Sequence, residues 1–193
     1  MAVSRWLPLG AVLMLLAILG WRSWWQRRRY GSAGVWFLRS ARWQENLRDA
    51  SGVLLVVLLI GQALTVTARP RSLVPGTALV ITGLVLLVLA QLNLGASWRI
   101  GIEEGSKPGL VTDGFYRFCR NPIYFAILVF LVGYALLLPT RLSLIMLVGA
   151  FIGIRQQVLT EEAHLTRAYG DAYRAYARRV GRFVPGIGRL RWP

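Results

Sequence analysis

The sequence predicts an all-α membrane protein with five transmembrane helices, a helical hairpin between the last two, and an amphipathic helix near the C-terminus. Of its 193 residues, 55% are hydrophobic and only 16% are charged, and the mean hydropathy is +0.50. The apolar residues fall in five blocks, each close to the roughly 20 residues that a membrane-crossing helix needs. The formal charge is +15, and nearly all of it lies outside these blocks.

The five apolar blocks define the predicted spans. A charged side chain at the centre of a span costs about 2.5–3.5 kcal/mol on insertion scales, and the blocks contain none except Arg155, near the end of the last. The blocks comprise residues 7–21, 52–68, 73–94, 123–138 and 142–158. A signal peptide is an alternative for the first block, but no small-residue cleavage site follows it, which favours a retained anchor.

The basic residues predict the orientation. Nineteen of the 23 Lys and Arg, and all eight Asp and Glu, fall on one side of the predicted membrane. Because positively charged loops stay in the cytoplasm, we expect an integral membrane protein of a bacterial inner membrane, with the N-terminus outside and the C-terminus cytoplasmic. We expect residues 1–89 to form an anchor region with a basic, Trp-rich inner loop at 22–50, and residues 90–193 to form the catalytic region. Residues 34–48 are predicted to lie on the membrane surface as a short helix.

The composition excludes several kinds of partner and site. Strongly basic chains often bind nucleic acid, but such proteins are not half hydrophobic, so we expect membrane lipids as partners instead. A single cysteine, Cys119, and a single histidine, His164, cannot build a Cys/His metal cluster. Glu161 and His164 have the spacing of a di-iron ligand pair, but the facing spans offer no further carboxylates. We therefore expect no metal, and the sequence leaves the oligomeric state open.

The first candidate site lies where the chain enters the fourth span. Asn121 is a good helix N-cap, and Pro122 suits the first turn of a helix. The N–H groups of such a helix start can hold an anionic group, although a simple cap at the membrane surface is the alternative that these residues alone favour. Gly109 and Gly114 would let the preceding loop approach a ligand closely.

The second candidate site follows the fifth span. Glu161 and Glu162 come with no polar linker, so we expect the helix to continue out of the membrane. A carboxylate among many arginines either forms a salt bridge or holds a cationic ligand, and the sequence leaves both open. An amphipathic face is predicted beyond this point by apolar residues at helical spacing, namely Leu165, Tyr169, Tyr173, Tyr176 and Val180.

A set of short motifs connects the two sites. In order, they are Leu94-Gly95-x-x-Trp98, Leu110-Val111-x-x-Gly114-x-Tyr116, Arg120-x-Pro122-x-Tyr124, Glu161-Glu162, Tyr169-Gly170-x-x-Tyr173-x-x-Tyr176, and Pro185. In order and spacing they resemble the family of integral membrane methyltransferases that includes isoprenylcysteine carboxyl methyltransferase and the phospholipid N-methyltransferases. The resemblance covers about half of the chain.

The resemblance implies S-adenosyl-L-methionine as the methyl donor, bound between the last spans and the C-terminal helix. It also implies a lipid-like or small hydrophobic acceptor that enters from the bilayer. Glu161 would pair with the cationic part of the donor. The cofactor-binding residues implied by the family pattern are Pro108, Gly109, Leu110, Val111, Tyr116, Asn121, Pro122, Ile123, Tyr124, Glu161 and Glu162.

Two positions depart from the family pattern. Asn121 replaces the usual His and cannot act as a base near pH 7. Gln157 stands where the prenylcysteine enzymes carry an Arg for the substrate, and Arg155 is the nearest basic residue, so Arg155 and Glu161 are the catalytic candidates. His164 is a candidate base for an amine or thiol acceptor, and the acceptor stays open.

Two other functions remain compatible with the sequence. Membrane sterol reductases, which use NADPH, share a similar C-terminal half, although this chain is short for that class. A non-enzymatic scaffold could bind anionic lipid through its Arg clusters.

Overall fold

The structure is a bundle of helices. A computed structural model describes residues 2–31, 43–66, 72–98 and 109–190, and within these ranges it contains no strand, only an isolated parallel bridge between Cys119 and Gly181. The predicted all-α class is confirmed. The helices are α1 (Ala2–Tyr30), α2 (Trp43–Thr65), α3 (Leu73–Leu94), the 3-10 helices η1 (Gly95–Ser97) and η2 (Gly114–Arg117), α4 (Pro122–Leu137), α5 (Arg141–Tyr169) and α6 (Asp171–Arg179).

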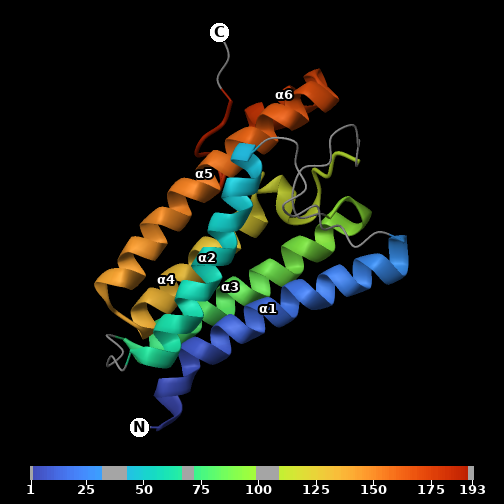
Figure 1. Ribbon diagram of the computed structural model, residues 1–193. Coiled ribbons are helices and arrows are strands. Elements are labelled where there is room, and N and C mark those ends of the chain that lie inside the picture. The colour runs from blue at the N-terminus through green and yellow to red at the C-terminus, as the bar shows by residue number, and fades with distance from the viewer. Residues whose placement is uncertain (1, 32–42, 67–71, 99–108, 191–193) are drawn as a thin grey trace.

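Four of the described helices are long and apolar enough to cross a membrane, namely α1, α2, α3 and α5. With 16 residues, α4 is about 24 Å long, which is short of a hydrocarbon core of about 30 Å. The five-span count therefore stays a prediction. Figure 1 shows that α1 begins at the end of the bundle opposite to α6. Which of these ends faces the cytoplasm, and in which membrane, also stays a prediction.

The predicted inner loop at 22–50 is helical at 22–30 and 43–50, and its place relative to the membrane stays a prediction. Helix α1 continues to Tyr30, and α2 already begins at Trp43. The Trp, Arg and Gln residues that follow the first apolar block all tolerate a helix, and the chain leaves it only at Gly31, which has φ +76°. Of the surface helix predicted at 34–48, the described part, from Trp43 onward, is the first turns of α2, and residues 34–42 lie outside the described ranges.

Two glycines allow α3 and α4 to pack closely. A Cβ on Gly83 would lie 2.7 Å from the backbone nitrogen of Phe130, and a Cβ on Gly133 would lie 2.6 Å from that of Val80. Small residues at such positions let helix backbones approach in membranes, where dispersion contacts drive association. The pair α3–α4 is therefore a tightly packed unit, and it holds the start of α4 next to the candidate site.

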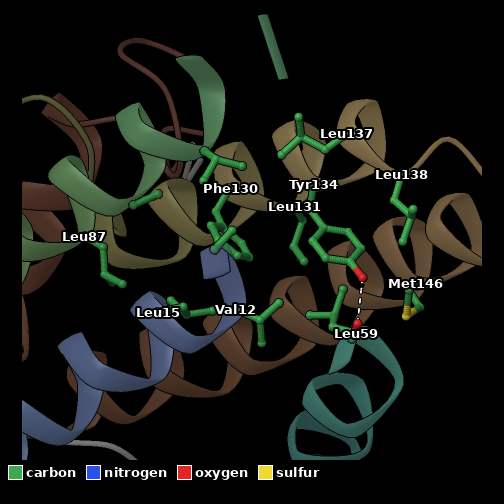
Figure 2. Close-up of a cluster of buried hydrophobic side chains, with 13 residues drawn as sticks. Val12, Leu15, Leu59, Leu87, Phe130, Leu131, Tyr134, Leu137, Leu138 and Met146 are labelled. Atoms are coloured by element: carbon green, nitrogen blue, oxygen red, sulfur yellow. Dashed lines mark hydrogen bonds between the residues drawn. The ribbon is translucent and has the colours of Figure 1, made fainter. Parts of the chain in front are cut away.

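A buried apolar cluster joins the five long helices (Figure 2). Tyr134 of α4 is 1% exposed, and its hydroxyl donates a hydrogen bond of 2.7 Å to the carbonyl of Leu59 in α2. This bond satisfies a phenol that would otherwise be buried without a partner, although the accepting carbonyl lies in a helix interior. The cluster contains Ala11, Val12, Leu15, Leu59, Val80, Leu87, Ala126, Phe130, Leu131, Tyr134, Leu137, Leu138 and Met146.

A buried arginine ties α1 to the end of α3. Arg22 is 0% exposed, and its guanidinium donates to the carbonyl of Gly95 at 2.6 Å and to the side chain of Gln26 at 2.6 Å. It also lies 4.8 Å from the ring centroids of both Trp25 and Trp98. The last carbonyls of a helix carry partial negative charge, so this cation stabilises the α3 terminus. Arg22 is thus a structural residue within α1 and not a loop charge.

The helix continues past the fifth apolar block as predicted, since α5 runs for 29 residues, about 43 Å, whereas its passage out of the membrane stays a prediction. The amphipathic face beyond it is divided, because α5 ends at Tyr169 and α6 begins at Asp171. Gly170, with φ +53°, makes the break. Tyr173, Tyr176 and Val180 are nevertheless buried together, and Leu165 and Tyr169 pack against them. The predicted set of residues therefore shares one apolar cluster across two helices.

Candidate active site

A cavity of about 740 Å³ lies where α2, α4, α5 and α6 meet the segment 109–121. One part of its wall is polar and includes Glu161, Gln157 and Arg48. The rest of the wall runs along apolar positions of α2, α4 and α5. These are Leu54, Leu55, Leu58, Leu59, Ile127, Leu131, Ile145, Met146 and Ala150. Such a wall suits a ligand that is polar at one end and apolar at the other.

Glu161 is fixed at the polar part of this cavity. The hydroxyl of Tyr124 donates to its Oε1 at 2.5 Å, and the amide of Gln157 donates to the same oxygen at 2.8 Å. Its Oε2 accepts no hydrogen bond from the described residues. The carboxylate is therefore held in one orientation by two donors while its second oxygen can meet a ligand.

Glu162, the next residue, forms ion pairs. It is 6% exposed, and its two oxygens accept from Arg120 at 2.8 Å and from Arg182 at 2.9 Å. The hydrogen bond with Glu162 raises the pKa of the Arg182 guanidinium. Of the two roles that the sequence left open, Glu162 has that of the salt-bridge partner. Glu161 faces the cavity, and its role as holder of a cationic ligand stays a prediction.

The start of α4 is held by the chain that follows α6. The backbone N–H of Arg120 donates to Gly181 O at 2.9 Å, and both the backbone and side-chain N–H groups of Asn121 donate to Arg182 O at 3.1 Å. The Arg120 guanidinium also donates to the carbonyls of Ala177 and Val180 at 2.8 and 2.7 Å. Asn121 occupies the N-cap position and Pro122 the first turn, as predicted, but the Asn121 side chain makes no cap hydrogen bond and bonds to Arg182 instead.

The loop before α4 is shaped by a tight turn at η2. Gly114 has φ +57°, and the Asn93 side chain accepts a hydrogen bond of 2.7 Å from the backbone N–H of Phe115. The Tyr176 hydroxyl donates to the carbonyl of Tyr116 at 2.6 Å. Burial, followed by the nearby Glu161 charge, raises the pKa of the Tyr116 phenol, so this side chain stays a neutral donor.

Part of the chain matches a known protein family. The model of the phospholipid methyltransferase family matches residues 72–172, just over half of the chain. The chain belongs to the phospholipid methyltransferase family. The resemblance drawn from the sequence motifs is thereby confirmed. The match begins at the start of α3, and the division of the chain at residues 89 and 90 stays a prediction.

Curated relatives of this family member are eukaryotic. The chain is 34% identical over 100 residues to protein-S-isoprenylcysteine O-methyltransferase of Schizosaccharomyces pombe, covering 51% of this chain and 42% of the relative. It is 32% identical over 119 residues to protein-S-isoprenylcysteine O-methyltransferase B of Arabidopsis thaliana, covering 58% of each. The chain thus spans about half the length of the curated relatives it matches.

A solved structure shares the fold. The eukaryotic intramembrane Ras methyltransferase, isoprenylcysteine carboxyl methyltransferase, superposes with a TM-score of 0.64 at 18% identity, covering 97% of this chain and 70% of that chain. With four apolar helices of spanning length among its described residues, the family member is an integral membrane protein.

Most of the predicted site residues of this phospholipid methyltransferase family member line the cavity. Three do not: Pro122 is buried in the first turn of α4, Glu162 is bound to two arginines, and Arg155 is an exposed residue of α5. Pro108 lies outside the described residues. The predicted residues that line the cavity are Gly109, Leu110, Val111, Tyr116, Asn121, Ile123, Tyr124 and Glu161, and His164 lines it as well.

Sequence reasoning missed two residues of the cavity wall. Gln91 of α3 is 0% exposed, and neither its amide nitrogen nor its amide oxygen has a hydrogen-bond partner among the described residues. Arg48 of α2 donates from Nη1 to Gln157 at 2.8 Å and to Thr160 at 2.9 Å. Polar side chains inside apolar spans mark functional sites, so Gln91 was detectable as an amide within the third block. Nothing in the sequence distinguishes Arg48 from the other basic residues before the second block.

Proposed function

We propose that this protein is an S-adenosylmethionine-dependent methyltransferase that acts in the membrane on an amphiphilic acceptor. The single observation that carries the proposal is the placement of Glu161, a carboxylate with one oxygen facing a cavity that is polar on one side and apolar on the other. Membership of the phospholipid methyltransferase family supports the reaction type.

The cavity and its donor set fit S-adenosylmethionine. A volume of about 740 Å³ falls within the range of small-molecule sites, about 300–1,000 Å³. Glu161 offers an anion to the cationic part of the donor. The first-turn N–H groups of α4, at Ile123 and Tyr124, suit its carboxylate, because a helix start carries partial positive charge. Gln91 supplies an amide nitrogen and an amide oxygen that have no partner in the part of the chain that the structure describes, and such a pair can bond the edge of an adenine.

The residues of the site act by positioning. S-adenosylmethionine supplies a methyl group that its sulfonium already activates. Tyr124 and Gln157 keep the Glu161 carboxylate in one orientation, so that it can align the cation above the acceptor side of the cavity. The segment 109–116 and the tyrosines of α6 contribute to the cavity wall, where they would limit the access of water to a bound donor. Positioning of this kind lowers a barrier by removing the entropy cost of alignment.

The acceptor enters along the apolar wall, between helices that the bilayer surrounds. The curated relatives carry names that specify an isoprenylcysteine acceptor, and a prenylated cysteine, with an apolar tail and a polar end, matches this wall. An aminophospholipid is amphiphilic in the same way. We therefore propose a lipid-like acceptor.

Thermal unfolding in detergent with increasing S-adenosylmethionine tests the proposal, because a ligand that binds only the folded state must raise the apparent stability. We expect a rise in Tm that saturates, that is absent with NADPH, and that Glu161→Gln removes. Asp171→Asn is the matched acid-to-amide control, since the Asp171 side chain is 96% exposed on α6. A flat response of the wild type, or a rise with NADPH instead, would overturn the proposal in favour of a scaffold or a reductase.

A further inference from the structure

Helix α1 carries exposed tryptophans at two levels. Trp6 is 56% exposed and Trp24 is 52% exposed, and none of residues 7–21 is charged. At 1.5 Å per residue, the rise from Trp6 to Trp24 is about 27 Å. A hydrocarbon core is about 30 Å thick, and tryptophans gather at its two boundaries. The two side chains therefore mark the levels at which α1 leaves the hydrocarbon core.

Three consecutive arginines follow Trp24 in the last turn of the helix. Arg27, Arg28 and Arg29 are all exposed, and none of their side chains forms an ion pair with the described residues. They lie about 4.5–7.5 Å beyond Trp24 along the helix axis. The headgroup layer on each side of the hydrocarbon core is about 5–7.5 Å thick. Three positive charges are thus at the level of the lipid phosphates.

A cation–π contact joins Arg28 to the tryptophan. The carbon at the centre of its guanidinium lies 4.6 Å from the ring centroid of Trp24, one turn earlier on the same helix face. A side chain that is already ordered loses less entropy when it binds a ligand. Because a guanidinium also matches the geometry of a phosphate, this contact prepares Arg28 to bind one.

The inward face of the same turns is fixed to the bundle. Arg22 donates to the Gly95 carbonyl at 2.6 Å, and Gln26 donates to the Ala96 carbonyl at 3.0 Å. These bonds tie the last turns of α1 to the chain at the end of α3. The basic cluster therefore stands on an anchored helix, and its three charges have a fixed place relative to Trp24.

We propose that Trp24, Arg27, Arg28 and Arg29 form a binding site for the headgroup of an anionic phospholipid. The arginines bind the phosphate, and the indole lies where the headgroup meets the hydrocarbon chains. A zwitterionic lipid has the same phosphate but also a cation, which three arginines repel, so the site prefers a lipid with net negative charge. None of these four residues lines the cavity, so the inference stands apart from the proposed methyl transfer.

Thermal unfolding in detergent with increasing dioctanoyl phosphatidylglycerol tests the site, because a lipid that binds the folded protein raises its Tm. We expect a rise that saturates for the wild type. Dioctanoyl phosphatidylcholine, which has the same chains, should give a much smaller rise, and inorganic phosphate should give none. The combined variant Arg27→Gln, Arg28→Gln and Arg29→Gln should weaken phosphatidylglycerol binding by roughly 100-fold, about fivefold for each arginine.

Two control variants separate a built site from net charge. The combined variant Arg167→Gln, Arg178→Gln and Arg179→Gln removes the same charge from exposed positions of α5 and α6 and should retain nearly the wild-type affinity. Trp24→Leu changes no charge, yet it should weaken phosphatidylglycerol binding about two- to fivefold, because Arg28 loses its aromatic partner.

Three results would overturn the inference. The first is a variant of the three α1 arginines that binds phosphatidylglycerol as tightly as the wild type. If its Tm also falls in every lipid, the arginines act only on the dipole of the helix end. The second is an equal loss of affinity in the control variant of α5 and α6. The third is a wild type whose Tm rises as much with phosphatidylcholine as with phosphatidylglycerol.

Discussion

Substitution by glutamine should affect Tm differently at the two adjacent glutamates, Glu161 and Glu162. Glu162→Gln removes the negative charge between Arg120 and Arg182, whose side chains are 1% and 22% exposed. Breaking a buried ion pair on one side typically costs about 3–5 kcal/mol, because the remaining charge stays buried without compensation. At about 2–4 °C per kcal/mol for a chain of this size, we expect Tm to fall by roughly 6–20 °C.

Glu161→Gln should leave Tm near the wild-type value. Its partners, Tyr124 and Gln157, are neutral donors that an amide oxygen can still accept from, and no arginine bonds to it among the described residues. The same substitution should abolish the rise in Tm with S-adenosylmethionine. Unfolding of both variants in one detergent, with and without S-adenosylmethionine, separates the two roles. An equal loss of Tm in both variants, or none in Glu162→Gln, would refute the reasoning.

Three further predictions concern the bundle. Gly133→Ala should lower the free energy of unfolding by about 1–3 kcal/mol, because its Cβ would lie 2.6 Å from the backbone of α3. Gly149→Ala, whose Cβ would meet no atom within 4 Å, should be neutral or slightly stabilising, and thermal unfolding compares the two variants. Arg22→Met should lower Tm, and Arg22→Lys should lower it as well, because a single ammonium cannot bond the Gly95 carbonyl and also fill the space between two tryptophan rings. Burial raises the pKa of the Cys119 thiol, so maleimide labelling of the folded protein should be slow at pH 7. The stability contributed by the neutral thiol should be complete below its ordinary pKa of about 8.5 and decline as the pH rises above it. A Cys119→Ala variant that keeps the same slope of Tm against pH would contradict this.

The apolar blocks were sufficient to predict the helices but not where each one ends. Helix α3 has the bounds of its block, 73–94, because Ser72 and Gly95 flank it directly. Helix α1 extends well past its block, because hydropathy reports where a chain meets lipid and not where its backbone stops being helical. The break at Gly170 was equally hidden, since the apolar spacing continues across it.

The candidate site could be predicted from the sequence only in part. Motif spacing identified the segment around Glu161, and the family resemblance gave Glu161 the cationic part of the donor. It also placed Glu162 among the cofactor-binding residues, because only the three-dimensional contacts show that Arg120 and Arg182 bind Glu162. It proposed Arg155 because that residue is close in sequence. The side chain that reaches Gln157 is Arg48, and no local pattern can reveal a contact between α2 and α5.

Equilibrium binding of tritiated S-adenosylmethionine to the purified protein in nanodiscs tests the central claim most directly. The account predicts saturable binding that S-adenosylhomocysteine displaces and NADPH does not, that is retained in Asp171→Asn and lost in Glu161→Gln. Binding that is absent from the wild type, or that survives Glu161→Gln with undiminished affinity, would contradict it.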